Sequence, residues 1–228
     1  MNYKILALDI DDTLLSGTIE ISQRNRQAIK KAQSAGVFVT IATGRNPLGS
    51  EVIWKALNVK GPIINFGGAM ITDTCTGKIL HTTSVDNAEV QEILDLAKEL
   101  SLHAQIYQKN GIVYERENEY AIAYAKALGI PRTVDPNIRK KQWENVPKVL
   151  MFAEAERASE LIPVLQKHFE GRIKVSASKP TFIEFNHISS NKGTALSKLA
   201  EIMGAAQAET VAIGDNSLDE EMILWAGL

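Results

Sequence analysis

The segment that most constrains the fold joins a short apolar run to a group of carboxylates. Residues 5–8 (Ile-Leu-Ala-Leu) are followed directly by Asp9, Asp11 and Asp12. The apolar run predicts a buried strand, which places Asp9 and Asp11 where that strand ends. Like charges this close repel each other unless a cation or a reacting group compensates them. Mg²⁺, which prefers oxygen ligands, is the cation expected, and the spacing suggests one carboxylate that attacks and one that handles protons.

Composition narrows the class of protein. The 228 residues allow one large domain or two small ones, and 45% of them are hydrophobic, enough for a sizeable core. Lys and Arg number 25 and Asp and Glu 27, so the net charge of -2 gives no reason to expect nucleic acid or a membrane as partner. Cys75 is the only cysteine, which excludes an internal disulfide. With no leader and no apolar run of about 20 residues, a cytoplasmic protein is expected.

The two ends of the chain alternate strand and helix. Strands are expected over residues 4–8, 37–42 and 62–66, with a helix at 23–35 capped by Ser22 and another starting at Pro47. The C-terminal part adds a helix at 192–203, a strand at 210–213 and a final helix that Ser217 would cap. This rhythm predicts an α/β fold with a doubly wound, mostly parallel, Rossmann-like sheet over residues 1–80 and 187–228.

The middle of the chain has a different pattern. Asn110-Gly111 lies between the segments 103–107 and 112–115 and predicts a β-hairpin. A helix that Asp86 and Glu89 would open, with apolar residues at helical spacing from Val90 to Leu100, is also expected. The remaining elements expected here are helices at 120–128 and 158–169 and strands at 148–153, 173–177 and 182–185, with a polar stretch at 133–145. Hairpins mixed with helices predict a separate α+β domain, inserted at residues 81–186.

Polar motifs recur at the ends of the expected strands of the parallel sheet. Thr43 follows the second strand, Lys192 opens a helix, and Asp215 follows the last strand. Ligands of open α/β sheets bind at the carboxyl ends of the strands, so these motifs are expected to meet. Asp9, Asp11 and Asp215 offer oxygens to Mg²⁺, the hydroxyl and backbone N–H of Thr43 can bind a phosphate oxygen, and Lys192 adds positive charge. This set of groups indicates phosphoryl transfer.

The chain resembles the haloacid dehalogenase (HAD) superfamily of phosphatases, and within it the Cof-type group. The resemblance spans essentially the whole chain and implies a Mg²⁺-dependent phosphomonoester hydrolase with an inserted αβ cap that selects the substrate, a small phosphorylated metabolite such as a sugar phosphate, nucleotide or cofactor phosphate. Four motifs occur in the family's order: Asp9-Ile10-Asp11-Asp12-Thr13-Leu14, Ile41-Ala42-Thr43-Gly44-Arg45, Lys192 within Ser190–Leu196, and Gly214-Asp215-Asn216-Ser217-Leu218-Asp219.

The resemblance also implies a role for each motif residue. Asp9 would be the nucleophile that forms an aspartyl-phosphate, and Asp11 would protonate the leaving oxygen and then deprotonate the attacking water. Asp9, the backbone carbonyl of Asp11, and Asp215 would bind Mg²⁺. The residues that would hold the phosphoryl group or support the others are Thr43, Gly44, Lys192, Asp219, Asn216 and Arg45. Lys192 would also orient Asp9, and Asp219 would fix Lys192 or a metal-bound water.

Alternatives remain open at this point. A phosphotransferase, such as a phosphomutase, would use the same aspartyl-phosphate with a sugar hydroxyl as acceptor, and an inactive chain would only bind a phosphate ligand. An equally suitable role for Asp219 is that of an acidic residue at a helix N-terminus, where its negative charge would interact favourably with the helix dipole. Arg45 would either contact the substrate or brace the cap.

The sequence departs from the family pattern in three places. Asp12 stands where the family usually has Gly, although Asp tolerates unusual backbone conformations. Gly67 stands where relatives commonly have Asn. Relatives also usually continue through another strand and helix, which implies a core truncated at its C-terminal end. A sheet edge left uncovered in this way would favour pairing with a second copy, as in a homo-oligomer.

Overall fold

The computed structural model describes residues 3–15 and 20–228, and the chain forms two compact units. The first unit contains Met1–Thr82 and Ser190–Leu228, and the second contains Thr83–Ser189. Each unit has its own sheets and its own hydrophobic core. Among the helices of the described ranges, none has the length and apolar character needed to cross a bilayer.

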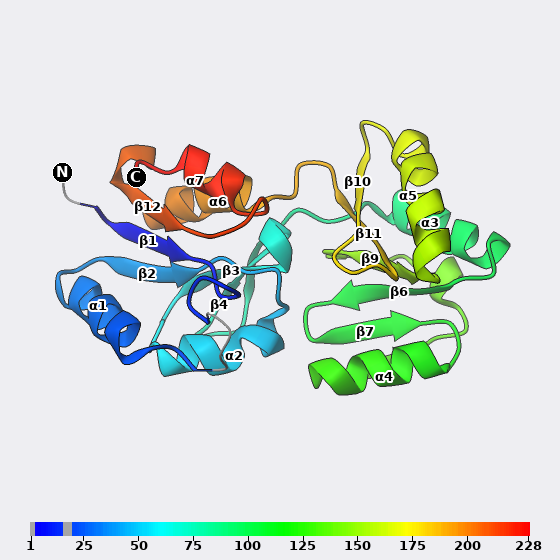
Figure 1. Ribbon diagram of the computed structural model, residues 1–228, viewed down its shortest axis with the longest axis horizontal. Helices are drawn as coiled ribbons and strands as arrows, with labels where there is room; N and C mark the ends of the chain where they lie inside the picture. The colour runs from blue at the N-terminus through cyan, green and yellow to red at the C-terminus, as the bar shows by residue number, and fades with distance from the viewer. Residues whose placement is uncertain (1–2, 16–19) are drawn as a thin grey trace. The chain divides into compact units, whose positions relative to one another are not determined.

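A parallel sheet forms the centre of the first unit. Its strands lie in the order β12 (Thr210–Ile213), β1 (Ile5–Leu8) and β2 (Phe38–Ile41), as Figure 1 shows. Leu8 is paired in register with Ile213 on one side and with Ile41 on the other. The three strands therefore end side by side, and the loops that follow them start from the same edge of the sheet.

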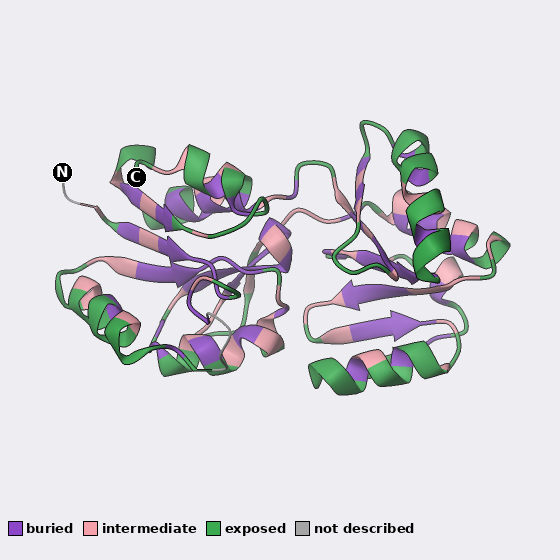
Figure 2. Cartoon of the chain, viewed as in Figure 1, coloured by how far each residue is buried: buried purple, intermediate pink, exposed green. Residues whose placement is uncertain are grey.

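Helices cover both faces of this sheet because its strand residues alternate between two cores. Leu8 and Ile41 pack on the side of α1 (Gln23–Ser34) and α2 (Pro47–Ala56), whereas Ile5, Ala7 and Ala212 pack on the side of α6 and α7. The helices on that second side are α6 (Lys192–Met203) and α7 (Glu220–Trp225). Figure 2 shows the buried strands between helices with exposed outer faces. The predicted doubly wound α/β core is confirmed.

The third expected strand is paired differently from the prediction. β3 (Pro62–Asn65) touches the parallel sheet through one isolated bridge, between Ala42 and Ile64. It then pairs in antiparallel fashion with β4 (Met70–Asp73), which pairs with β5 (Ile79–Thr82). Only a short 3₁₀ turn, Phe66–Gly68, joins β3 to β4, and a parallel crossover needs a much longer connection.

The second unit is built on a six-stranded sheet in the order β10-β11-β9-β6-β7-β8, antiparallel except between β7 and β8. Helices α3 (Asn87–Glu99) and α5 (Ala155–His168) contribute to one core with strand residues such as Met151 and Phe185. The other elements are β6 (His103–Gln108), β7 (Gly111–Tyr114), α4 (Glu119–Leu128), β8 (Arg132–Val134), η2 (Ile138–Lys140), β9 (Val149–Phe152), β10 (Ile173–Ser176) and β11 (Phe182–His187). The first unit also contains η3 (Gln207–Glu209).

Two details of the second unit differ from the sequence-based expectation. The hairpin forms, but Gly111 pairs with Gln108, so the turn is Lys109-Asn110 and Gly111 belongs to β7. A β-carbon at position 111 would overlap the backbone carbonyl of Pro131, which explains why glycine occupies this position. The stretch at 132–134 forms β8, parallel to β7, although all three of its residues are exposed and carry no apolar pattern.

Candidate active site

A buried lysine lies between two buried carboxylates at the carboxyl edge of the parallel sheet. Nζ of Lys192 is 2.5 Å from Oδ1 of Asp9 and 2.5 Å from Oδ1 of Asp219. The residues are 2%, 3% and 0% exposed, respectively. Asp9 follows β1, Lys192 opens α6 and Asp219 precedes α7, so three distant segments supply the cluster. Each charge in it compensates another, because an unpaired buried charge would be costly.

Asp219 also shapes the loop that follows β12. Its Oδ2 accepts hydrogen bonds from the backbone N–H groups of Asp215 at 3.2 Å and Asn216 at 3.3 Å. The prediction that Ser217 caps the final helix is wrong: Asp219 is the N-cap residue of α7, and its carboxylate makes no capping bond to that helix. The side chain is directed instead to Lys192 and to the preceding loop. Asn216 supports the same loop, accepting from the N–H of Leu218 at 2.8 Å.

The second oxygen of Asp9 is unsatisfied. Oδ2 is buried and has no hydrogen-bond partner within the described residues. Burial raises the pKa of Asp9, and the hydrogen bond from Lys192 opposes that rise. Asp9, Asp215 and Asp219 can place one oxygen each within 4.8 Å of one another. Since Asp219 is already engaged, Oδ2 of Asp9 and the exposed carboxylate of Asp215 are the oxygens suited to a hard divalent cation.

The side chain of Asp11 is not part of this acidic group and pairs with Arg45 instead. Arg45 donates from Nε to Oδ2 of Asp11 at 3.0 Å and from Nη2 to Oδ1 at 2.5 Å, a two-pronged contact. The hydrogen bond to Asp11 raises the pKa of Arg45. Arg45 also donates from Nη1 to the carbonyl of Gly49 at 3.2 Å. The next residue, Asp12, has a φ of 65°, so Asp adopts at this position an unusual, left-handed backbone conformation of the kind it was expected to tolerate.

Thr43 lies at the end of β2 and is fully buried. Its hydroxyl accepts a hydrogen bond from the backbone N–H of Arg45 at 3.1 Å. The expectation that the N–H of Thr43 binds a phosphate oxygen is wrong, because it donates to the carbonyl of Ile64 at 3.0 Å. Only the hydroxyl is left for that purpose. The neighbouring Gly44 is exposed, and the space around its Cα is open.

Two residues of this site had no assigned role in the sequence. The hydroxyl of Thr13 donates to Oδ1 of Asp215 at 2.6 Å and orients that carboxylate. Gly68 lies against the carbonyl of Asn191, the residue before Lys192, so closely that a β-carbon there would overlap it. Thr13 stands inside the first motif, but its partner is 202 residues away, and no local pattern indicates such a contact.

Comparisons with known proteins identify related sequences and structures. A family model described as haloacid dehalogenase-like hydrolase matches residues 6–228. The Bacillus subtilis protein YxeH is 29% identical over 99% of this chain and 85% of its own length. Bacillus subtilis YwtE, named as a 5-amino-6-(5-phospho-D-ribitylamino)uracil phosphatase, is 30% identical over 98% of this chain and 85% of its own length. The crystal structure of TM0651 from Thermotoga maritima has a TM-score of 0.86 at 30% identity, covering 99% of this chain and 85% of that one.

Proposed function

This chain belongs to the haloacid dehalogenase-like hydrolase family, and we propose that it is a Mg²⁺-dependent phosphomonoester hydrolase acting through an aspartyl-phosphate on Asp9. One observation carries the proposal. The Asp9 carboxylate is held by Lys192 through one oxygen, while the other oxygen is buried without a partner. A carboxylate left half-satisfied in this way is suited to attack and to cation binding rather than to stability.

The proposed reaction has two steps. In the first, a carboxylate oxygen of Asp9 attacks phosphorus, the bond from phosphorus to the ester oxygen breaks, and Asp11 gives a proton to the departing oxygen. In the second, water attacks phosphorus, Asp11 takes a proton from that water, and the bond between phosphorus and Asp9 breaks to release phosphate. Lys192 fixes the orientation of Asp9 and offsets the negative charge of the phosphoryl group.

Arg45 has a defined place in this scheme. It donates one hydrogen bond to each oxygen of Asp11, which holds that carboxylate in one orientation and leaves a second lone pair on each oxygen for proton transfer. We assign Arg45 to the orientation of Asp11. The hydroxyl of Thr43, with Gly44 beside it, is assigned to the phosphoryl oxygens.

The donor set fits a divalent cation. Oδ2 of Asp9 and the carboxylate of Asp215, which Thr13 orients, would hold it, and the backbone carbonyl of Asp11 is assigned as a further ligand. When bound, Mg²⁺ would supply positive charge to the phosphoryl oxygens.

The proposed substrate class is a small phosphorylated metabolite. Support comes from YwtE, whose name specifies a small compound that carries a phosphate group. We assign the choice among such compounds to the second unit, which would act as the cap that the sequence places at residues 81–186.

The decisive experiment measures phosphate release from 4-nitrophenyl phosphate, with Mg²⁺ and with a chelator. We expect Mg²⁺-dependent release that Asp9→Asn lowers by at least about 10³-fold, because the nucleophile is lost. Asp12→Asn is the matched control: Asp12 is exposed three residues away, and Asn tolerates its φ of 65°. This variant should keep its activity within a few-fold.

Two outcomes would contradict the proposal. Full activity of Asp9→Asn in Mg²⁺ would remove Asp9 as nucleophile. Transfer of the phosphoryl group to an added sugar, with no phosphate released into water, would identify a phosphotransferase instead.

A further inference from the structure

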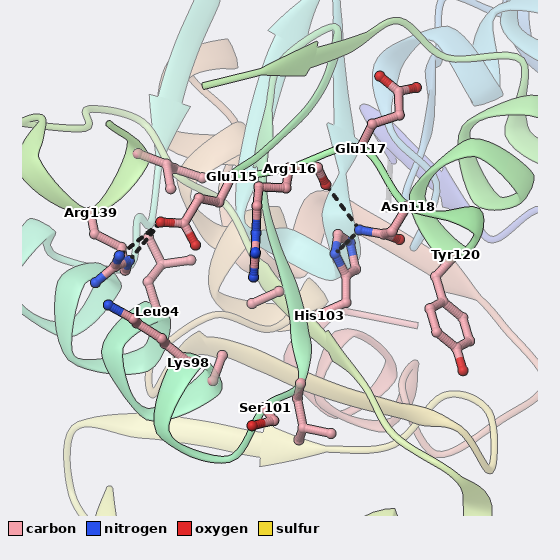
Figure 3. Close-up of a pocket in the computed structure, with 14 residues that line it drawn as sticks. Leu94, Lys98, Ser101, His103, Glu115, Arg116, Glu117, Asn118, Tyr120 and Arg139 are labelled. Atoms are coloured by element: carbon pink, nitrogen blue, oxygen red, sulfur yellow. Dashed lines mark hydrogen bonds and ion pairs between the residues drawn. The ribbon is translucent and has the colours of Figure 1, made fainter. Parts of the chain in front are cut away.

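The second unit contains a pocket of about 440 Å³ that none of the candidate active-site residues line. It lies between the C-terminal part of α3, the start of β6, the segment after β7, and η2 (Figure 3). This volume falls within the range of small-molecule sites. Part of its lining is apolar, including the buried side chains of Leu94, Ala97 and Ile138.

Each carboxylate that lines the pocket has a cationic partner. Glu115 accepts from Nη2 of Arg139 at 2.7 Å, and Arg139 also pairs with Asp95 at 3.2 Å. Glu117 pairs with Arg132 at 3.1 Å. Every acidic side chain of the lining is therefore paired, with Arg139 shared between Glu115 and Asp95.

Two cations of the lining remain uncompensated. Within residues 3–15 and 20–228, the side chains of Lys98 and Arg116 form no ion pair and no hydrogen bond. Figure 3 shows Arg116 extending into the middle of the pocket, between the pair formed by Glu115 and Arg139 and the side chain of His103. Both side chains are exposed, and with Arg139 they give the lining three cations against the two carboxylates Glu115 and Glu117. This excess of positive charge favours an anion there.

Neutral polar groups complete the wall beside Arg116. The amide nitrogen of Asn118 lies 2.7 Å from Nδ1 of His103 and donates to the carbonyl of Arg116 at 3.0 Å. These contacts fix the backbone from which Arg116 projects. Burial lowers the pKa of His103, so its ring is neutral at neutral pH and adds no charge to the pocket.

We propose that this pocket binds a small organic anion with an apolar body. The anionic group, a carboxylate or a phosphate, is held by Arg116 and Lys98, and the body lies against Leu94 and Ala97. Guanidinium is well suited to such planar or tetrahedral oxyanions because it offers paired donors.

The test titrates the ¹⁵N-labelled full-length protein with phenylacetate and, separately, with phenylphosphonate, and follows backbone amide shifts. We expect saturable shifts at His103, Asn118 and Arg116, and the probe that binds more tightly identifies the preferred anionic group. Arg116→Gln should raise the apparent Kd at least tenfold. Lys126→Gln, an exposed lysine of the same unit that does not line the pocket, should leave the Kd unchanged.

Two results would overturn the proposal: no saturable shift at these amides with either probe, or an equal Kd for Arg116→Gln and the unmodified protein. Phenylphosphonate shifts confined to the neighbours of Asp9 would count as the first of these. The readout needs no turnover, so it stands whether or not the chain hydrolyses phosphate esters.

Discussion

At the scale of single residues, Lys192 is the group on which we expect both the stability of the candidate site and the proposed reaction to depend. It is the cation that two buried carboxylates share, so its loss leaves both without a counter-charge. Lys192→Met is expected to lower the free energy of unfolding by about 3–5 kcal/mol, measured by urea denaturation without Mg²⁺.

Lys198→Met is the control for that change. Lys198 lies on the same helix and pairs with Glu201, but both side chains are exposed, so a loss below about 1 kcal/mol is expected. Equal losses for the two variants would show that the buried cluster contributes nothing particular.

A second prediction at the scale of single residues concerns Gly68. Its φ is 107°, and a β-carbon would overlap the carbonyl oxygen of Asn191, which immediately precedes Lys192. Gly68→Ala is therefore expected to cost about 3 kcal/mol of stability and to reduce activity, because the start of α6 must shift. Gly67→Ala has only the backbone strain of a φ of 65°, with open space around it, and should cost about 1 kcal/mol. Comparable losses would argue against the close contact.

At the scale of elements, Glu92 ties α3 to the end of α5 and to the residue before β10. It accepts from Arg172 at 2.9 Å and contacts Nε2 of His168 at 2.7 Å. The hydrogen bond from Arg172 lowers the pKa of Glu92. Because the folded-state pKa lies below the unfolded value of about 4.3, the stabilisation is present above that pH and is lost as the pH falls through the folded pKa.

Glu92→Gln should therefore destabilise the protein at pH 7, and its difference from the unmodified protein should narrow below about pH 4.3. Urea denaturation across pH 3–7 measures this. Glu99→Gln, an exposed change on the same helix, should show no such pH-dependent difference. A difference for Glu92→Gln that stays constant down to pH 3 would rule out this ionic contribution.

At the scale of the whole molecule, the two units differ in how the chain builds them. The second unit is one continuous segment, Thr83–Ser189, with its own core around Phe169 and Ile183. We expect residues 83–189 expressed alone to unfold cooperatively in urea, followed by circular dichroism and by the fluorescence of Trp143. Phe169→Ala should lower that stability by about 3–5 kcal/mol. A broad, non-cooperative transition of the isolated segment would contradict this expectation.

Local patterns in the sequence were sufficient to predict the elements whose own apolar residues show which positions are buried. Apolar runs located β1 and β12, and Ser22 caps α1 as expected, its hydroxyl accepting from the N–H of Asn25 at 3.1 Å. β4, β5 and β8 escaped prediction because none of them is a continuous apolar run and each is held by its partner strand. Short strands depend on pairing more than on their own pattern.

The sequence by itself determined which chemical groups reach the edge of the sheet, because Asp9 follows directly on a buried strand and that order is local. The pairing of Lys192 with Asp9 and Asp219 is the one that the family resemblance implied. Only the tertiary structure decided the other two pairings, Asp11 with Arg45 and Thr13 with Asp215. These partners lie 27 to 202 residues apart. The periodicity of apolar residues indicates which side of an element is buried. The partner of a buried charge depends instead on how separate elements pack, because each buried charge needs a counter-charge nearby.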